Sequence, residues 1–219
     1  MSYFRRLWPI LFTAIPCLAQ SWEIGAEGGF SFYHDATISN AGSSANAGFG
    51  SRIAASGLIG EDVGQYFGGE LRYTYLDGDS RLSAGGETVR LNGAAHAVHY
   101  EFLAYATPKH SRLRPFVTAG AGIKRYTATG AQYQQILNAE PPLGNFALLA
   151  HTDEVEALVT FGGGLKIKLN DHCDVRLDFR DYLTPFPEDL FITPKGATIH
   201  GWLNDFVPMA GIDWTFGKP

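Results

Sequence analysis

The sequence predicts an all-β protein, an eight-stranded antiparallel up-and-down transmembrane β-barrel, and three observations predict it. Apolar and polar residues alternate with period 2 over stretches of about ten residues, which is typical of strands with two unlike faces. Short and long connections alternate between these stretches. The chain is also rich in glycine and in aromatic residues: it has 26 Gly and 13% aromatics, where average usage gives roughly 15 Gly for this length.

The first 19 residues are predicted to be a signal peptide. Two arginines precede an apolar stretch of signal-peptide length, and small residues at the −3 and −1 positions place the cleavage between Ala19 and Gln20. The alternative, an uncleaved anchor, needs roughly 20 apolar residues, and this stretch has about 12. The predicted domains are a signal peptide over 1–19 and a barrel domain over 20–219, with Cys173 as the single cysteine of the mature chain.

The first four alternating segments set aliphatic and aromatic residues against glycine and charged residues. Their apolar faces carry Trp22 and Phe30 (segment 22–32), Phe49 and Ile59 (47–59), Tyr73 and Tyr75 (66–76), and Val98 and Phe102 (94–106). Their polar faces carry, in the same order, Glu23 and Glu27, Gly50 and Arg52, Glu70 and Arg72, and His99 and Glu101. Each segment therefore predicts a strand with one apolar and one polar side.

The last four segments continue the pattern. Their apolar faces carry Val117 and Ile123 (115–126), Val159 and Leu165 (156–169), Val175 and Leu177 (173–182), and Ile212 and Trp214 (206–216). Their polar faces carry Thr118 and Lys124, Thr160 and Lys166, Arg176 and Asp178, and Gly211 and Asp213. Eight is an even number, as a closed antiparallel barrel requires. Pro208, inside the last segment, is the one local conflict, because proline cannot donate a ladder hydrogen bond.

The connections predict which end of the barrel faces outward. Short connections fall near 60–65, 107–113 and 170–172, and long ones near 34–46, 77–92, 127–154 and 183–205. Outer-membrane barrels combine short periplasmic turns with long extracellular loops, so we expect three such turns and four such loops.

Apolar pieces in the two longest loops leave three interpretations open. These pieces are 133–137, 146–150 and 190–193. They form a contact surface, or strands that extend above the membrane, or a cover whose parts pack on each other over the barrel mouth.

Alternation alone does not decide which face is inside, because a soluble lipocalin-like barrel turns its apolar face inward around a ligand. The polar face carries much of the surplus glycine, which a narrow lumen needs beside large side chains. The negative and positive residues on this polar face are also nearly equal in number. Buried charges need partners of opposite sign, so this near-equality is expected of a filled lumen. Both features favour an apolar face toward lipid. The candidates for salt bridges in the lumen are Arg52, Glu70, Arg72, Glu101, Lys124, Lys166, Arg176, Asp178, Arg180 and Asp213.

Aromatic residues gather at the strand ends, as in the girdles that mark the two interfaces of a membrane. One predicted rim consists of Trp22, Phe67, Phe102, Trp214 and Phe216. The other consists of Phe30, Phe32, Tyr73, Tyr75, Phe179 and Phe206.

Three segments carry a family resemblance: Arg114-Pro-Phe-Val-Thr-Ala-Gly-Ala-Gly122, Phe161-Gly-Gly-Gly-Leu-Lys-Ile-Lys-Leu169 and Ala210-Gly-Ile-Asp-Trp-Thr-Phe216. The sequence resembles the small eight-stranded outer-membrane barrels of the OmpA/OmpX type. Ile212, Trp214 and Phe216 are similar to the C-terminal insertion signal of that group, which usually ends on the aromatic residue. Here the residues 217–219 follow.

The resemblance implies a place in the outer membrane of a Gram-negative-type bacterium. It implies outer-membrane lipid and lipopolysaccharide as partners, together with the barrel-assembly machinery during insertion. We expect a monomer without a periplasmic domain, because the chain ends with the last strand. A net charge of −5 argues against nucleic acid as a partner.

No cofactor, metal ion or catalytic residue is expected, and the predicted role is structural or interactive, through the loops. The alternatives are a lipid-modifying enzyme similar to the lipid A deacylases, or a lipocalin-like binder of a small apolar ligand. A deacylase-like site needs His-x-Ser, which does not occur, although His96 and Ser51 have apolar-face parity. His96 and His99 lie three apart on one strand, so they point to opposite faces and form no metal site. A small pore is weakly supported, because opposed charges should seal the lumen.

Overall fold

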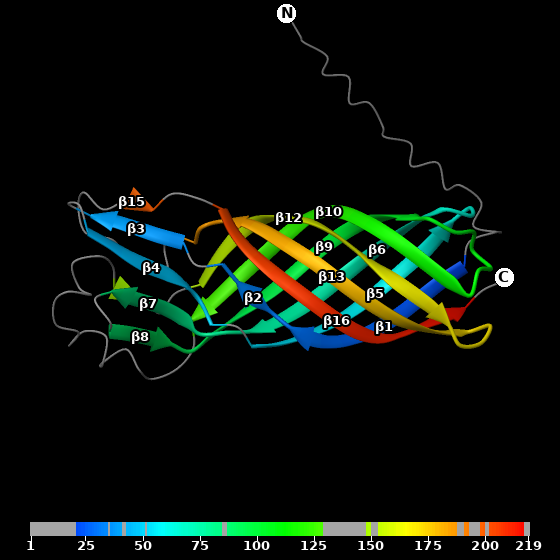
Figure 1. The fold of residues 1–219 in the computed structure, drawn as a ribbon, viewed down its shortest axis with the longest axis horizontal. Coiled ribbons are helices and arrows are strands. Elements are labelled where there is room, and N and C mark those ends of the chain that lie inside the picture. The colour runs from blue at the N-terminus through cyan, green and yellow to red at the C-terminus, as the bar shows by residue number, and fades with distance from the viewer. Residues whose placement is uncertain are drawn as a thin grey trace, which may run out of the picture.

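An eight-stranded antiparallel barrel forms the body of the protein in the computed structural model (Figure 1). Its strands pair in chain order, and the last pairs with the first to close the barrel. They are β1 (Ser21–Phe30), β5 (Ile53–Val63), β6 (Phe67–Asp77), β9 (Gly93–Tyr105), β10 (Leu113–Ala128), β12 (Asp153–Lys168), β13 (Cys173–Pro185) and β16 (Trp202–Phe216). The predicted fold class is confirmed.

The structure describes residues 21–34, 36–40, 43–50, 52–84, 87–128, 148–149, 153–187, 191–192, 198–199 and 202–216. The predicted cleavage between Ala19 and Gln20, the loop piece 133–137 and Ser51 lie outside these residues. Within the described part of the chain, no helix is long and apolar enough to cross a membrane.

The strands are where the alternation predicts them, but several of them extend further. β5 continues to Val63, and β16 already begins at Trp202. The segment 47–59 is two elements, because β4 (Ser43–Phe49) ends before β5 begins. β5 turns into β6 at Gly64, whose φ of 71° lies in the left-handed region that glycine adopts without steric cost.

The structure resolves the conflict at Pro208. β16 keeps an unbroken register with β13 through Pro208, which pairs with Phe179. On its other side, the pairing with β1 ends at Gly29↔Met209, and it resumes in the same register with β2 (Phe32–Tyr33) at Phe32↔Phe206. The ladder is therefore interrupted at the position where proline has no amide hydrogen to donate.

The two ends of the barrel differ. The three short connections, 64–66, 106–112 and 169–172, lie at the end where β1 begins and β16 ends, which we call the turn end. The opposite end, at the left of Figure 1, carries a second sheet and is called the loop end. That sheet has the order β15-β3-β4-β7-β8, from Thr198–Ile199, Ala36–Asn40, Ser43–Phe49, Ser80–Ala84 and Glu87–Leu91.

Two of the apolar loop pieces meet each other. β11 (Leu148–Leu149) pairs with β14 (Phe191–Ile192), so parts of the pieces 146–150 and 190–193 form a short antiparallel sheet. This contact agrees with the interpretation in which the loop pieces pack on one another.

The apolar face of the barrel is outside. Phe102 is 70% exposed and Phe67 63% exposed, while Arg72, Arg176 and Arg180 inside the barrel are fully buried. Every residue predicted for the two aromatic rims has an outward-facing, exposed side chain. This arrangement is the reverse of what a soluble barrel with an apolar lumen requires, so the lipocalin-like alternative is excluded.

Glycines on the inner face leave room for the buried charged side chains. A Cβ atom at Gly164 would lie 2.5 Å from Asp178 Oδ1 and 2.6 Å from the ring of Phe116. At Gly25 it would lie 2.1 Å from Asp213 Oδ1. The surplus of glycine on the polar face therefore reflects the crowding of a narrow, filled lumen.

Candidate functional site: the charged lumen and its turn-end mouth

Two carboxylates at the centre of the lumen each contact three arginines. Glu70 on β6 lies 2.9 Å from Arg72, 2.7 Å from Arg176 and 3.2 Å from Arg180. Asp178 on β13 lies 2.7 Å, 3.0 Å and 3.3 Å from the same three guanidinium groups. Inward-facing positions of β6 and β13 bring these five residues together across the barrel. We call them the central hub.

Further carboxylates surround the hub. Glu27 on β1 pairs with Arg72 and lies 3.4 Å from Arg176. Glu101 on β9 accepts a hydrogen bond from Arg180 Nε at 2.8 Å. All these side chains are removed from solvent. Because an isolated buried charge is very costly, this mutual pairing is what permits so many charges inside the barrel.

The next layer toward the turn end is also charged. Lys166 on β12 pairs with Glu23 and lies 3.5 Å from Asp213. Arg114 on β10 pairs with Asp62 at 3.0 Å, and its guanidinium lies 3.7 Å from the centre of the Tyr105 ring. This ring contact adds a cation–π attraction to the ion pair.

The layer toward the loop end holds one cation among aromatic rings. The ammonium of Lys124 on β10 donates to Asp205 on β16 at 2.8 Å. It lies 4.7 Å from the ring centre of Tyr33, 5.2 Å from Tyr126 and 5.6 Å from Tyr182. Tyrosine rings therefore fill the lumen on the loop side of the hub.

Nine of the ten lumen candidates lie within these layers, and Arg52 does not. Its side chain is 46% exposed at the loop end, where it pairs with Asp77 at 3.4 Å and with Asp79 at 2.7 Å. The prediction for Arg52 is wrong because β5 begins one residue later, so the side chain lies beyond the barrel wall.

The predicted salt-bridge candidates leave out several charged members of the lumen, among them Asp62, Asp205, Glu23 and Glu27. Asp62 and Asp205 lie in the parts of β5 and β16 beyond the predicted strand ends. Both continue the inward parity of their strands, and that signal could have found them. Glu23 and Glu27 have the parity of the polar face, but their partners come from strands far away in the sequence.

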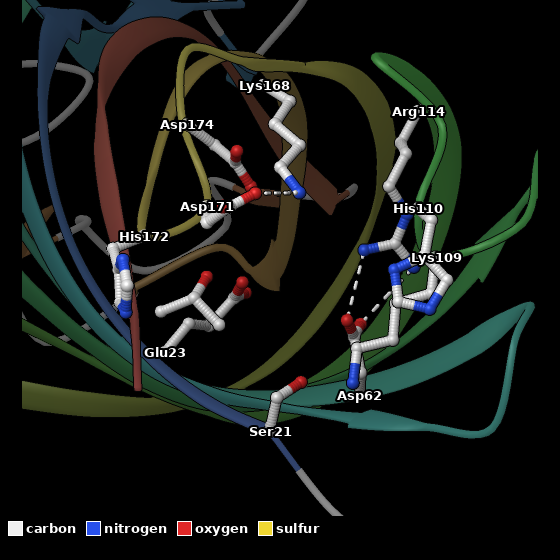
Figure 2. A pocket seen from close by; sticks show the side chains of 11 residues that line it. Ser21, Glu23, Asp62, Lys109, His110, Arg114, Lys168, Asp171, His172 and Asp174 are labelled. Carbon is white, nitrogen blue, oxygen red and sulfur yellow. Dashed lines mark hydrogen bonds and ion pairs between the residues drawn. The ribbon is translucent and has the colours of Figure 1, made fainter. Parts of the chain in front are cut away.

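A cavity of about 320 Å³ opens at the turn end, next to the Lys166 layer (Figure 2). We call it the vestibule. Glu23, Asp171, His172 and Asp174 lie on one side of it in Figure 2, and Lys109, His110, Arg114 and Asp62 on the other. The turns 106–112 and 169–172 bring these groups together. The vestibule is thus a polar mouth above a lumen that is filled with charge pairs.

The outward-facing His96 contacts two tyrosines, and Ser51, the other residue with apolar-face parity, lies outside the described residues. His96 Nδ1 lies 2.8 Å from the Tyr73 hydroxyl, and its ring packs 5.4 Å from that of Tyr75. His99 lies on the opposite face, buried in the lumen 3.4 Å from Glu101. In the turn after β12, Asn170 Oδ1 accepts hydrogen bonds from the amides of His172 and Cys173. This turn is held by its own backbone contacts.

The proposed C-terminal signal lies on the outer surface. Ile212, Trp214 and Phe216 all point outward from β16 at the turn end, and Trp214 stacks on His172 with ring centres 5.8 Å apart. Trp214 and Phe216 face their cross-strand partners Ile24 and Trp22 on β1. These residues therefore lie at the seam where the last strand closes the barrel.

Comparison with known proteins agrees with this architecture. The family model described as "Outer membrane protein beta-barrel domain" matches residues 10–198. Neisserial surface protein A is 10% identical, with a TM-score of 0.51 over 89% of this chain and 97% of that chain. Outer membrane protein AlkL, solved in DMPC lipid bilayers, is 12% identical, with a TM-score of 0.50 over 98% of each chain. At these identities the likeness to the solved structures shows the fold alone. A search of curated protein sequences found no match.

Proposed function

Because the chain belongs to the family of outer membrane protein beta-barrel domains, we propose that it is a sealed barrel that anchors and displays its loop end outside the cell. In this role the barrel transports nothing through its lumen and catalyses no reaction. The sheet and loops at the loop end make the contacts with other molecules.

The central hub is the observation that carries this proposal. Arg72, Arg176 and Arg180 are fully buried, and each contacts both Glu70 and Asp178. A solute that crosses the lumen would have to part several of these contacts at once. Parting a buried ion pair costs several kcal/mol, about 3–5 when one partner is lost. The hub therefore supports a closed barrel. In such a barrel, the sheet and loops at the loop end would carry the function.

The second sheet supports the display role. β3, β4, β7, β8 and β15 stand beyond the loop end of the barrel, where long connections rather than tight turns join the strands (Figure 1). A rigid barrel would hold this sheet at a fixed orientation to the membrane. Binding residues on loops positioned by a rigid scaffold are a common arrangement.

We place the mature protein in the outer membrane as a monomer, inserted by the barrel-assembly machinery and surrounded by lipid and lipopolysaccharide. Export by a signal peptide cleaved after Ala19 completes this proposal. The intact mass of protein purified from outer membranes checks the cleavage, because the mature chain should begin at Gln20.

The display role is tested by epitope tags at the two ends of the barrel. A tag inserted between Ala84 and Glu87, in the β7–β8 connection, should bind antibody on intact cells. The matched tag in the turn 106–112 should bind only after the cells are permeabilised. Heat-modifiable gel migration would show that both tagged proteins are folded. Labelling of the turn tag on intact cells would contradict the proposed orientation.

A further inference from the structure

The vestibule carries charged groups of opposite sign on opposite walls. Asp174, at the start of β13, lines one wall beside Glu23, and Lys109 and His110, in the turn before β10, line the other (Figure 2). The separation follows from the topology, because the β12–β13 turn and the β9–β10 turn approach the mouth from different sides. A molecule in this cavity would therefore meet a negative wall and a positive wall.

Several of these groups are not used by the protein. No side-chain hydrogen bond or ion pair joins Asp174, Lys109 or His110 to other residues in the described ranges. Most other charges of the vestibule are already paired: Asp62 with Arg114, Lys168 with Asp171 at 3.1 Å, and Glu23 with Lys166. The side chains without a polar partner are thus a carboxylate on one side, next to His172, whose ring stacks on Trp214, and an ammonium and an imidazole on the other.

Two buried polar atoms near the vestibule also lack a protein partner. Ser21 is 2% exposed and lines the cavity, and its hydroxyl has no hydrogen-bond partner within the described residues. Arg114 Nε is buried and unpartnered as well. Buried polar groups are normally hydrogen-bonded, so an unpartnered hydroxyl that lines a cavity is available to a bound water or ligand.

We propose that the vestibule binds a small zwitterion that carries a free amine and a free carboxylate, the chemistry of an amino acid or a short peptide. The amine lies against Asp174 and Glu23, and the carboxylate lies against Lys109 and His110. The Ser21 hydroxyl contributes a hydrogen bond from the floor of the cavity.

The size and the surroundings of the cavity fit this class of ligand. A volume of about 320 Å³ is at the lower end of the range for small-molecule sites, roughly 300–1,000 Å³. A simple anion would leave Asp174 facing a negative charge, and a simple cation would leave Lys109 facing a positive one. Only a ligand with both charges satisfies both walls.

NMR titration of the folded, ¹⁵N-labelled protein in nanodiscs tests the proposal with three probes. Alanyl-alanine carries both charges, N-acetyl-alanyl-alanine lacks the amine, and alanyl-alanine amide lacks the carboxylate. We expect alanyl-alanine to shift the amides of Ser21, Lys109 and Asp174. Each blocked probe should bind at least about tenfold more weakly, as loss of one charge-assisted contact predicts.

Substitutions in the two walls test which wall binds the amine of the ligand and which binds its carboxylate. Asp174→Asn should reduce the preference for alanyl-alanine over its N-acetyl form, because one of the two partners of the amine is lost. Lys109→Gln should in the same way reduce the preference for alanyl-alanine over its amide form. Asp153→Asn, the same chemical change at the loop end, should behave like the wild type. Heat-modifiable migration shows that each variant is folded.

The absence of shifts with alanyl-alanine would overturn the proposal. So would equal binding of all three probes, or unchanged probe selectivity in the Asp174 and Lys109 variants. Binding that appears only after removal of residues 217–219 would assign the cavity to the chain itself, and would also overturn it. None of these results depends on whether the lumen conducts, so the two proposals stand or fall separately.

Discussion

At the scale of single residues, the lumen is organised by carboxylates that serve several arginines at once. Glu70 contacts three guanidinium groups, and Asp178 contacts the same three. Replacement of one such carboxylate leaves several positive charges undercompensated where water cannot reach them. The effect should therefore be much larger than for an ion pair at the surface.

Glu70→Gln keeps the shape of the side chain and removes its charge. We expect the free energy of unfolding to fall by about 3–5 kcal/mol, the cost of removing one partner from a buried pair. Urea-induced unfolding in lipid vesicles measures this. Asp171→Asn is the control, because Asp171 is 86% exposed in its pair with Lys168, and its change should stay within about 0.5 kcal/mol. Equal effects of the two substitutions would argue against the hub.

Gly164→Ala tests the crowding of the lumen. The new methyl group would lie 2.5 Å from Asp178 Oδ1 and 2.3 Å from the Leu177 carbonyl oxygen. Overpacking of this kind costs about 1–3 kcal/mol. Gly28→Ala is the matched control, since Gly28 faces outward and nothing lies within 4 Å of its added Cβ. The same vesicle unfolding assay should show a loss of stability for the first variant only.

At the scale of elements, much of the barrel is predictable because the residues of each strand alternate between apolar ones that face lipid and polar ones that face the lumen. A period of 2 identifies the strand and its inner face, as Arg176 and Asp178 against Val175 and Leu177 illustrate. The strand ends are less predictable. Alternation weakens where the wall meets loops, and for this reason Asp62 and Asp205 were missed.

The composition of the hub was not predictable from the sequence. Parity places Glu70, Arg72 and Asp178 on inner faces, but it does not say which levels of distant strands coincide. That depends on the stagger of neighbouring strands around the closed barrel. The vestibule was missed for the same reason, because it combines two turns that are about sixty residues apart in the chain.

A charge placed on the outer face tests the orientation of the strands toward lipid. Leu71 and Val63 are 51% and 49% exposed, so a soluble barrel would tolerate arginine equally at both. Leu71 lies between the aromatic rims, whereas Val63 lies at the turn end. We expect Leu71→Arg to cost about 2–4 kcal/mol and Val63→Arg about 0–1 kcal/mol in vesicle unfolding. Equal costs would contradict a membrane-spanning wall.

At the scale of the whole molecule, three layers of paired charge and aromatic side chains occupy the barrel between the vestibule and the loop end. The layer of Lys166 and Arg114 lies toward the turn end, and the central hub lies in the middle. The layer of Lys124 and its neighbouring tyrosines lies toward the loop end. The mean hydropathy of −0.07 conceals this division, because it averages a lipid-facing wall with a charged interior. This filling of the lumen is the basis of the proposal that the barrel is an anchor rather than a channel.

Single-channel recording of the purified protein in planar lipid bilayers tests the sealed lumen most directly. Insertion should be verified independently, by heat-modifiable migration of protein recovered from the same lipid. An outer-membrane porin in the same bilayers serves as the positive control. We expect the inserted protein to give no stepwise current, because the ion pairs of the hub close the path. Stable, ohmic current steps from the wild-type protein would contradict the account.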